Sequence, residues 1–253
     1  MKRMGKLCRL TALPLLASLA FALSLTPALA ARVAVTVEKL VLGEDFIVEP
    51  TLVDLPEGQT AADVITTLLS SKFPGVEAYS SSGTGEYFYM SGIYDPSRGE
   101  LLSAFSEGEL SGWMVAVNNE FLGTSAGVHA MRDGDVMRWQ YTKRLGADLG
   151  EDPNNLGFST KADKDLLIWR VAEINAAGNK SAYGASYSAA MSALGDLDST
   201  QVSVDSALKG LSESSPGPGA DGGEKNSGGG CDTGAFGLAA AAVLAAVSRK
   251  HRD

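Results

Sequence analysis

The order of short alternating segments and one helical segment is the feature that most constrains this fold. Residues 33–37 alternate as in a half-buried strand, and residues 46–53 supply a partner, so a hairpin opens the domain. A helical segment follows, and several strand-like segments come after it. This order predicts an α+β domain in which one helix covers one face of a mixed sheet.

The covering helix is predicted from a capping pattern and one apolar stripe. Thr60, with Asp63 three residues on, is typical of a helix N-terminus, and we expect the helix to end before Pro74. The stripe consists of five residues at helical spacing: Ala61, Val64, Ile65, Leu68 and Leu69. A β-grasp-like sheet with this one covering helix satisfies the whole pattern.

Three further strands are predicted after the helix. Residues 87–94 are aromatic and strand-like, residues 113–117 form the next strand, and Asn118-Asn119 is suited to a tight turn at positive φ. Residues 136–142 form the last strand. Its alternation places Met137, Trp139 and Tyr141 on one face and Val136, Arg138 and Gln140 on the other.

The pattern changes near residue 150, where alternating segments give way to helical spacing and an Ala, Ser and Leu composition. We therefore place the β-grasp-like domain at residues 31–150 and a small three-helix segment at residues 160–211. Residues 212–230 form a linker rich in Gly, Pro and Ser.

The N-terminal residues 1–30 have the pattern of a secretory signal peptide. A basic start is followed by an apolar run and by Ala28-Leu29-Ala30, so cleavage is predicted after Ala30 by a signal peptidase. The alternative is an uncleaved membrane anchor, but the apolar run is shorter than the roughly 20 residues of a spanning helix.

The C-terminal residues 231–253 combine Cys231, a short Ala-rich run over residues 235–247 and a basic end. With the preceding Ser-Gly-Gly-Gly, they resemble the Synergist-type CTERM sorting signal. The resemblance implies cleavage near Gly230 or Cys231 by a rhomboid-like sorting protease, and a lipid on Cys231. The alternative is a weak tail anchor left in place. Either way, we expect the chain to be exported and held at the cell envelope.

Charge and cysteine usage exclude several classes of function. The formal charge is −9; the signal carries +4 and residues 231–253 carry +1, so residues 31–230 carry −14. This charge argues against a nucleic-acid partner, which needs clustered Lys and Arg. Residues 31–230 contain no cysteine and one histidine, so neither a disulfide nor a thiolate metal site is expected there.

Residues 33–148 resemble the transcobalamin C-terminal-like family. The segments that carry the resemblance are SGWMVAVNNE at 111–120 and DGDVMRWQYT at 133–142, supported by residues 56–64, 89–93 and 125–128. In animal vitamin B12 transport proteins, a domain of this type closes over bound cobalamin. The resemblance therefore implies a β-grasp-like fold and a corrinoid or another flat cofactor as the ligand. No resident cofactor and no metal site are predicted.

Six residues are candidates for contact with such a ligand: Tyr89, Tyr94, Trp113, Asn118, His129 and Trp139. The two tryptophans offer large rigid faces, although strand residues of this kind are more often core. The tyrosines suit an exposed sheet face. Turn chemistry already explains Asn118, and His129 is more often an ordinary loop residue than a cobalt ligand or general base.

No catalytic motif is present in the sequence. A Gly-x-Ser-x-Gly elbow and a phosphate loop are missing, and no glycine-rich stretch precedes a helix inside a βαβ unit, as a dinucleotide motif would. We therefore expect a non-enzymatic binding module at the cell envelope. The alternative is a structural or protein-interaction module that docks another envelope protein, with the helical segment as a spacer.

Overall fold

A computed structural model describes residues 30–151, 157 and 159–214, which belong to one compact unit. Ala30, the predicted cleavage position, is the first described residue and is exposed. The rest of the signal peptide, Gly230, Cys231 and the C-terminal sorting segment lie outside the described residues. The structure confirms the predicted α+β class, and its described residues form a mixed five-stranded sheet, a second small sheet and four α-helices.

The five-stranded sheet has the strand order β2-β1-β8-β6-β7. β1 (Arg32–Glu38) pairs antiparallel with β2 (Phe46–Asp54) and parallel with β8 (Val136–Thr142). β6 (Gly112–Val117) pairs antiparallel with β8 and with the short β7 (Glu120–Phe121). The first strand and the last strand thus lie side by side in the middle of the sheet, which is the β-grasp-like arrangement.

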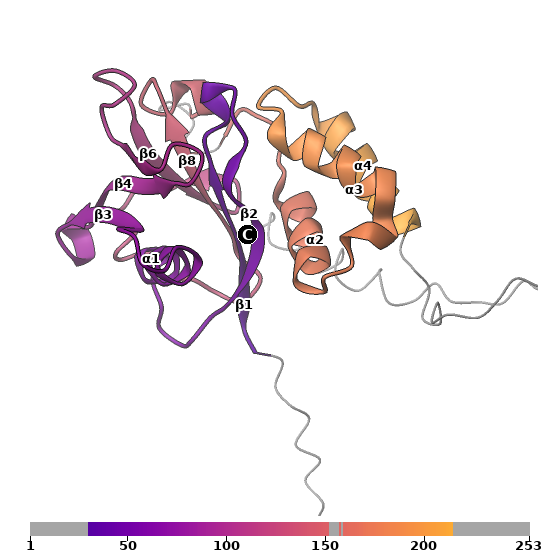
Figure 1. The fold of residues 1–253 in the computed structure, drawn as a ribbon, viewed down its shortest axis with the longest axis horizontal. Helices are drawn as coiled ribbons and strands as arrows, with labels where there is room; N and C mark the ends of the chain where they lie inside the picture. Colours follow the sequence, from indigo (N-terminus) through magenta and orange to yellow (C-terminus); the bar gives the residue numbers. More distant parts are fainter. Residues whose placement is uncertain (1–29, 152–156, 158, 215–253) are drawn as a thin grey trace, which may run out of the picture. The chain divides into compact units, whose positions relative to one another are not determined.

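One face of this sheet is covered by a helix and a small second sheet. The helix is α1 (Ala61–Lys72), and the small sheet consists of β3 (Tyr79–Ser82), β4 (Tyr89–Asp95) and β5 (Glu100–Ser103). Figure 1 shows α1, β3 and β4 on the same side of the large sheet. Their apolar side chains share a single core with the large sheet.

The opposite face is covered by the helical segment. It consists of α2 (Asp165–Ala176), α3 (Lys180–Gly195) and α4 (Gln201–Glu213), which are the three helices predicted between residues 160 and 211. α2 packs against β2, β1 and β8, and α3 and α4 pack on α2. Ala34 and Val136 from the sheet share an apolar cluster with these helices. Figure 1 shows the helices on the side of the sheet away from α1.

Two expectations need correction because both faces of the sheet are covered. β1 was expected to be half-buried, but every residue from Val33 to Glu38 is buried, and so is all of β8. A sheet with helices on both faces has no solvated side. The helical segment is also more than a spacer, since it packs against the sheet and encloses a core with it.

Local chemistry explains the ends of α1 and the β6–β7 turn. Thr60 and Asp63 form the predicted capping box, and α1 ends at Lys72 with Phe73 as its C-cap, before Pro74. Asn118 and Asn119 have φ values of 52° and 60°, the left-handed conformation predicted for this tight turn. β4 begins at Tyr89 and not at residue 87, because a 3₁₀ turn precedes it. The 3₁₀ helices are Leu40–Leu42, Gly85–Tyr87 and Ala147–Leu149.

Candidate functional site

The two candidate tryptophans belong to the core. Trp113 on β6 is 8% exposed and Trp139 on β8 is 3% exposed. Trp113 Nε1 donates to the carbonyl of Leu102 at 2.8 Å, and its ring packs edge-on against Tyr141 with the ring centres 5.2 Å apart. In this conformation neither tryptophan presents a face to a flat ligand, since both lie beneath α1 and the small sheet.

The other four candidates lie in separate places. Tyr89 is 45% exposed at the start of β4, whereas Tyr94 is half-buried with its ring packed edge-on against Phe73. Asn118 holds the β6–β7 turn through hydrogen bonds with Asp135 and Val136. His129 is half-buried in a loop, and its carbonyl accepts a hydrogen bond from α1. The structure does not gather the six candidates into one site.

A buried polar cluster lies on the face of the sheet beneath the helical segment. Arg138 donates from Nε and Nη2 to the two carboxylate oxygens of Glu38, at 2.9 and 2.8 Å, and Thr36 donates to the same carboxylate at 2.7 Å. Burial raises the pKa of Glu38, but the charge and hydrogen bonds of Arg138 outweigh it and hold this pKa below its ordinary value. The result is a fully paired buried carboxylate.

The start of α2 adds two ionisable groups to this cluster. Lys164 Nζ donates to the carbonyls of Leu194 and Asp196, and burial lowers the pKa of Lys164 to about 8. Burial and the nearby carboxylate of Asp163 raise the pKa of Asp165 to about 7. Asp165 Oδ1 is buried without a hydrogen-bond partner among the residues that the structure describes. Shifted pKa values of this kind are common in active sites, but they also arise in closed ion networks.

Three ionisable members of the cluster are closed to solvent. Glu38, Arg138 and Lys164 are each no more than 5% exposed. None of them lines either of the two surface cavities described below. In this conformation neither of these two cavities therefore opens onto the three groups.

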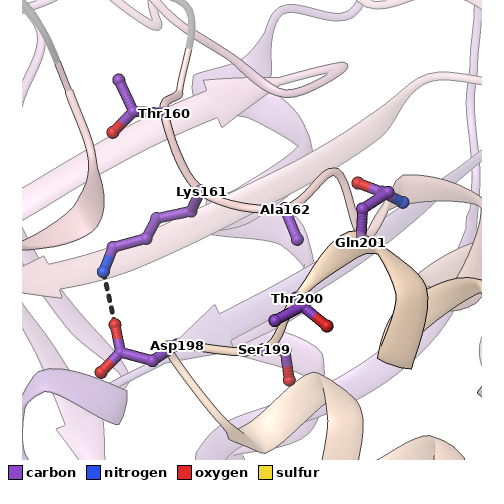
Figure 2. A pocket seen from close by; sticks show the side chains of 7 residues that line it. All are labelled: Thr160, Lys161, Ala162, Asp198, Ser199, Thr200 and Gln201. Carbon is purple, nitrogen blue, oxygen red and sulfur yellow. Dashed lines mark hydrogen bonds and ion pairs between the residues drawn. The ribbon is translucent and has the colours of Figure 1, made fainter.

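One cavity, of about 470 Å³, lies where the segment before α2 meets the loop between α3 and α4. An ion pair between Lys161 Nζ and Asp198 Oδ1, 2.6 Å apart, stands at its edge. Figure 2 shows these two side chains pointing toward each other. The cavity is lined by Thr160, Lys161, Ala162, Asp198, Ser199, Thr200 and Gln201, which include no aromatic residue.

A second cavity of about 470 Å³ lies between the sheet and the end of α2. Arg170 lies over the ring of Tyr183 and also donates to Glu173, so its charge is already partnered. None of the six sequence candidates lines either of these two cavities.

A different surface stands out on the two loops that extend from β5 and β8. Phe105, Leu110 and Leu145 are 64%, 51% and 63% exposed. Leu145 N donates to the carbonyl of Leu110 at 3.0 Å and so joins the two loops, while Phe105 N donates to the carbonyl of Ser111 at 3.0 Å within the first loop. We call these three side chains the apolar tip.

The backbone of the apolar tip is strained. Phe105 has a φ of 68° and Leu145 a φ of 49°. A bulky residue in the left-handed region is a genuine outlier, and such residues persist only where the surrounding structure holds them. They cluster at functional sites. Here two large apolar side chains at strained backbone positions are exposed to solvent and lie outside the core.

Polar groups beneath the first loop hold it in place. The hydroxyl of Tyr141 donates to the Ser103 carbonyl at 2.8 Å and lies 3.0 Å from the Ser106 hydroxyl. Ser111 Oγ donates to the Gly108 carbonyl and accepts from Glu107 N. Loop 104–111 is therefore fixed from below by a tyrosine of the central sheet.

The second loop has its own support. Thr142 and Asp148 are hydrogen-bonded to each other, and Thr142 Oγ1 also accepts from the backbone N–H groups of Arg144 and Gly146, at 3.0 and 2.8 Å. Lys143 N donates to Asp148. These bonds fix residues 143–146, so Leu145 is presented on a rigid loop.

The charges around the apolar tip are mixed. Lys143 and Arg144 directly precede Leu145 and are exposed, and neither forms an ion pair within the described part of the chain. Glu107 is paired with Arg98 at 2.9 Å, which leaves Glu109 as the exposed carboxylate of loop 104–111. Asp148 adds a half-buried carboxylate to the second loop, so the acidic and basic side chains of the two loops offset each other.

Sequence reasoning missed the apolar tip. The available signal was three large apolar residues in polar surroundings, in Ala-Phe-Ser, Glu-Leu-Ser and Arg-Leu-Gly. Single apolar residues of this kind are common on protein surfaces, so the signal is weak without the structure.

No family model and no curated protein sequence matches this chain. Among the described residues, none of the helices has both the length and the apolar character to cross a membrane. The same residues contain no group of His, Cys, Asp or Glu side chains placed to hold a metal ion.

Proposed function

We propose that this chain is an exported, non-enzymatic docking module of the cell envelope, which contacts another envelope component through the apolar tip. The observation that carries the proposal is the rigid, strained and exposed placement of Phe105 and Leu145 on two joined loops. A fold gains no stability from this arrangement, so a binding role accounts for it better.

The two ends of the sequence support the location. The signal pattern up to Ala30 implies export, and the tail after Gly230 implies attachment at the envelope. Intact-mass measurement on protein from the native envelope tests this part. We expect a chain that starts at Ala31 and ends near Gly230 or Cys231, and an acyl increment if Cys231 carries a lipid. A mass that ends at Asp253 contradicts the sorting prediction.

The closed polar cluster supports the non-enzymatic part of the proposal. Glu38 and Lys164 are groups that chemistry would need, and both are buried between the sheet and the helical segment. Cobalamin binding, implied by the family resemblance, stays a prediction of the sequence. A tryptophan-quenching titration with cobalamin and cobinamide tests it, and no quenching at millimolar ligand excludes it.

The docking role is tested by photocrosslinking in cells that produce the full chain. A photoreactive phenylalanine analogue at position 105 should form adducts with the envelope component that the apolar tip contacts. The matched control carries the analogue at position 202, where Val202 is 75% exposed on α4. Adducts specific to position 105 support the proposal. Equal adducts at both positions, or none at position 105, contradict it.

A further inference from the structure

We infer that the cavity between the sheet and the end of α2 binds a zwitterionic amino acid or short peptide, whose carboxylate pairs with Arg32. The inference is independent of the proposed docking function, because this cavity and the apolar tip share no residue. Three features of the described residues carry it: the polar groups left without partners, the mixed charges around them and the size of the cavity.

The two surface cavities differ in how fully their polar side chains are paired. In the cavity beside α4, Lys161 pairs with Asp198, and Gln201 donates to a carbonyl and to a carboxylate. In the cavity at the end of α2, Arg32 forms no ion pair within the described part of the chain, and Asn179 Oδ1 has no hydrogen-bond partner there. This second cavity therefore has a capacity for binding that the fold does not use.

The unpaired guanidinium of Arg32 is the strongest of these observations. Among the described arginines that are buried or half-buried, Arg138 pairs with Glu38 and Arg170 with Glu173, whereas Arg32 pairs with no carboxylate. A charge taken partly out of water without a counter-ion is costly. A carboxylate of a ligand supplies the missing partner, since a guanidinium binds a carboxylate through two parallel hydrogen bonds.

The charges around the cavity are mixed, and they favour a zwitterion over a simple anion. Glu173 lines the cavity, and its side chain is 38% exposed although it accepts from Arg170. Asp54 lies opposite Arg32 in the β1–β2 register, and Asp133 accepts from the backbone N–H of Arg32. These carboxylates repel a simple anion, but they attract the ammonium group of an amino acid or peptide.

Asn179 adds a polar group that the fold leaves unused. It stands at the N-cap position of α3, yet its side chain forms no cap bond. Its buried Oδ1 also has no other partner among the described residues. Because nothing fixes the amide in place, it can turn this oxygen toward an N–H group of a ligand in the cavity. A peptide N–H or an ammonium group is such a donor.

The size of the cavity suits a small ligand. Its volume of about 470 Å³ lies within the range of roughly 300–1,000 Å³ that is typical of small-molecule sites. Its apolar part consists of Leu52 from β2 and of Ile174, Ala176 and Ala177 around the end of α2. This apolar part accommodates a side chain, while the polar groups bind the two charged ends of the ligand.

Saturation-transfer NMR on the full chain tests the inference. The ligands offered are a mixture of alanyl dipeptides that covers the ordinary side chains, each with a free ammonium and a free carboxylate. We expect at least one dipeptide to bind, and isothermal titration calorimetry then measures its Kd. Amidation of its carboxylate and acetylation of its ammonium should each weaken binding by at least about tenfold, because each removes one of the two charges.

Three substitutions locate the binding in this cavity. Arg32→Gln removes the cation and should weaken binding by at least about tenfold. Ala177→Phe fills the cavity without a change of charge and should block binding. Asn179→Ala should weaken it about fivefold, the loss expected for one hydrogen bond. The matched control is Arg132→Gln, which removes an exposed arginine outside the lining and should leave the Kd unchanged. Unchanged thermal unfolding of the ligand-free variants shows that the fold is intact.

The failure of this inference is distinct from a failure of docking. If no dipeptide binds at millimolar concentration, or if binding survives both Arg32→Gln and Ala177→Phe, the inference is overturned. Equal binding of the amidated or the acetylated dipeptide also overturns it, because the ligand is then not read as a zwitterion. None of these results bears on the crosslinks at position 105, which test the apolar tip alone.

Discussion

The two faces of the five-stranded sheet are buried to a similar degree but consist of different side chains. Val35 and Met137 belong to the face beneath α1, where an apolar core continues into the small sheet. Their sequence neighbours Thr36 and Arg138 belong to the face beneath the helical segment, where polar and apolar residues are mixed. The same two strands thus supply two kinds of core.

This difference in composition decides how strictly each face of the sheet constrains the element that covers it. An apolar face tolerates any cover of suitable volume, because hydrophobic contacts have no fixed direction. A face that contains the Glu38–Arg138 pair requires a cover that leaves both charges satisfied, since an unpaired buried charge is costly. We therefore expect α1 to contribute mainly stability and α2 to be placed more specifically.

The largest expected effect comes from breaking the pair on the polar face. Glu38→Gln leaves Arg138 buried without its counter-ion, and we expect a loss of about 3–5 kcal/mol in the free energy of unfolding. Urea denaturation followed by circular dichroism measures it. The double variant Glu38→Leu and Arg138→Met removes both charges and should recover most of the loss. A loss below about 1 kcal/mol in the single variant would show that the Glu38–Arg138 pair does not determine how the helical segment is placed on the sheet.

On the apolar face, the corresponding substitution creates a cavity instead of an unpaired charge. Ile65 on α1 is fully buried, and we expect Ile65→Ala to cost about 3 kcal/mol through lost burial and an incompletely closed cavity. Ile65→Val should cost about 1 kcal/mol. This graded response is what distinguishes the two faces. If Ile65→Val costs as much as Ile65→Ala, the apolar face is as intolerant as the polar one.

The polar face should also make stability depend on pH. The pKa of Asp165 is raised from 3.8 to about 7, so its stabilising contribution is complete below about pH 4 and is lost as the pH rises through about 7. The groups that act on it are Asp163, Arg138, Glu38 and Asp135. We expect the free energy of unfolding to fall by about 2 kcal/mol between pH 5 and pH 7.5.

Asp165→Asn is the control for this pH effect, because an amide does not titrate. Urea denaturation across the same pH range should show a flatter profile in the variant. Lys164, whose pKa is lowered to about 8, acts mainly above this range and so does not mask the difference. A parallel decline in the variant and the unchanged chain would assign the pH dependence to other groups.

Much of the large sheet could be predicted because its strands alternate strongly. The alternation of residues 136–142 places Trp139 and Arg138 on opposite faces, and the structure confirms both the strand and its two faces. The capping box of Thr60 likewise fixed the start of α1. These are local signals, which depend on neighbouring residues alone.

The remaining features depend on contacts between distant residues. β3 and β5 are four residues long and have no clear alternation, so pairing with β4 decides that they are strands. The Glu38–Arg138 pair joins residues 100 positions apart. At Phe105 and Leu145 the positive φ contradicts the local residue preference, and the backbone N–H groups of these residues donate to Ser111 and Leu110, which are not their neighbours in the sequence. The apolar tip was therefore not predictable from the sequence.

The smallest expected effect concerns the helix caps on the two faces. Thr60 belongs to a reciprocal capping box, in which Asp63 N donates to Thr60 Oγ1 and Thr60 N donates to Asp63. Thr200 caps α4 with a single bond from Ser203 N at 3.2 Å. We expect Thr60→Ala to cost about 1 kcal/mol and Thr200→Ala about half of that, since the first breaks a two-way cap and the second a one-way cap.

Acid pH sharpens the comparison of the two caps. Hydrogen bonds from Thr60 lower the pKa of Asp63, so the stabilisation from this cap is present above the ordinary pKa of the carboxyl and is lost as the pH falls through the lowered pKa. The cost of Thr60→Ala should therefore shrink at acid pH, while that of Thr200→Ala should not. Urea denaturation at neutral and acid pH measures both costs. Equal costs that keep their size in acid would mean that the Asp63 half of the box adds nothing to α1.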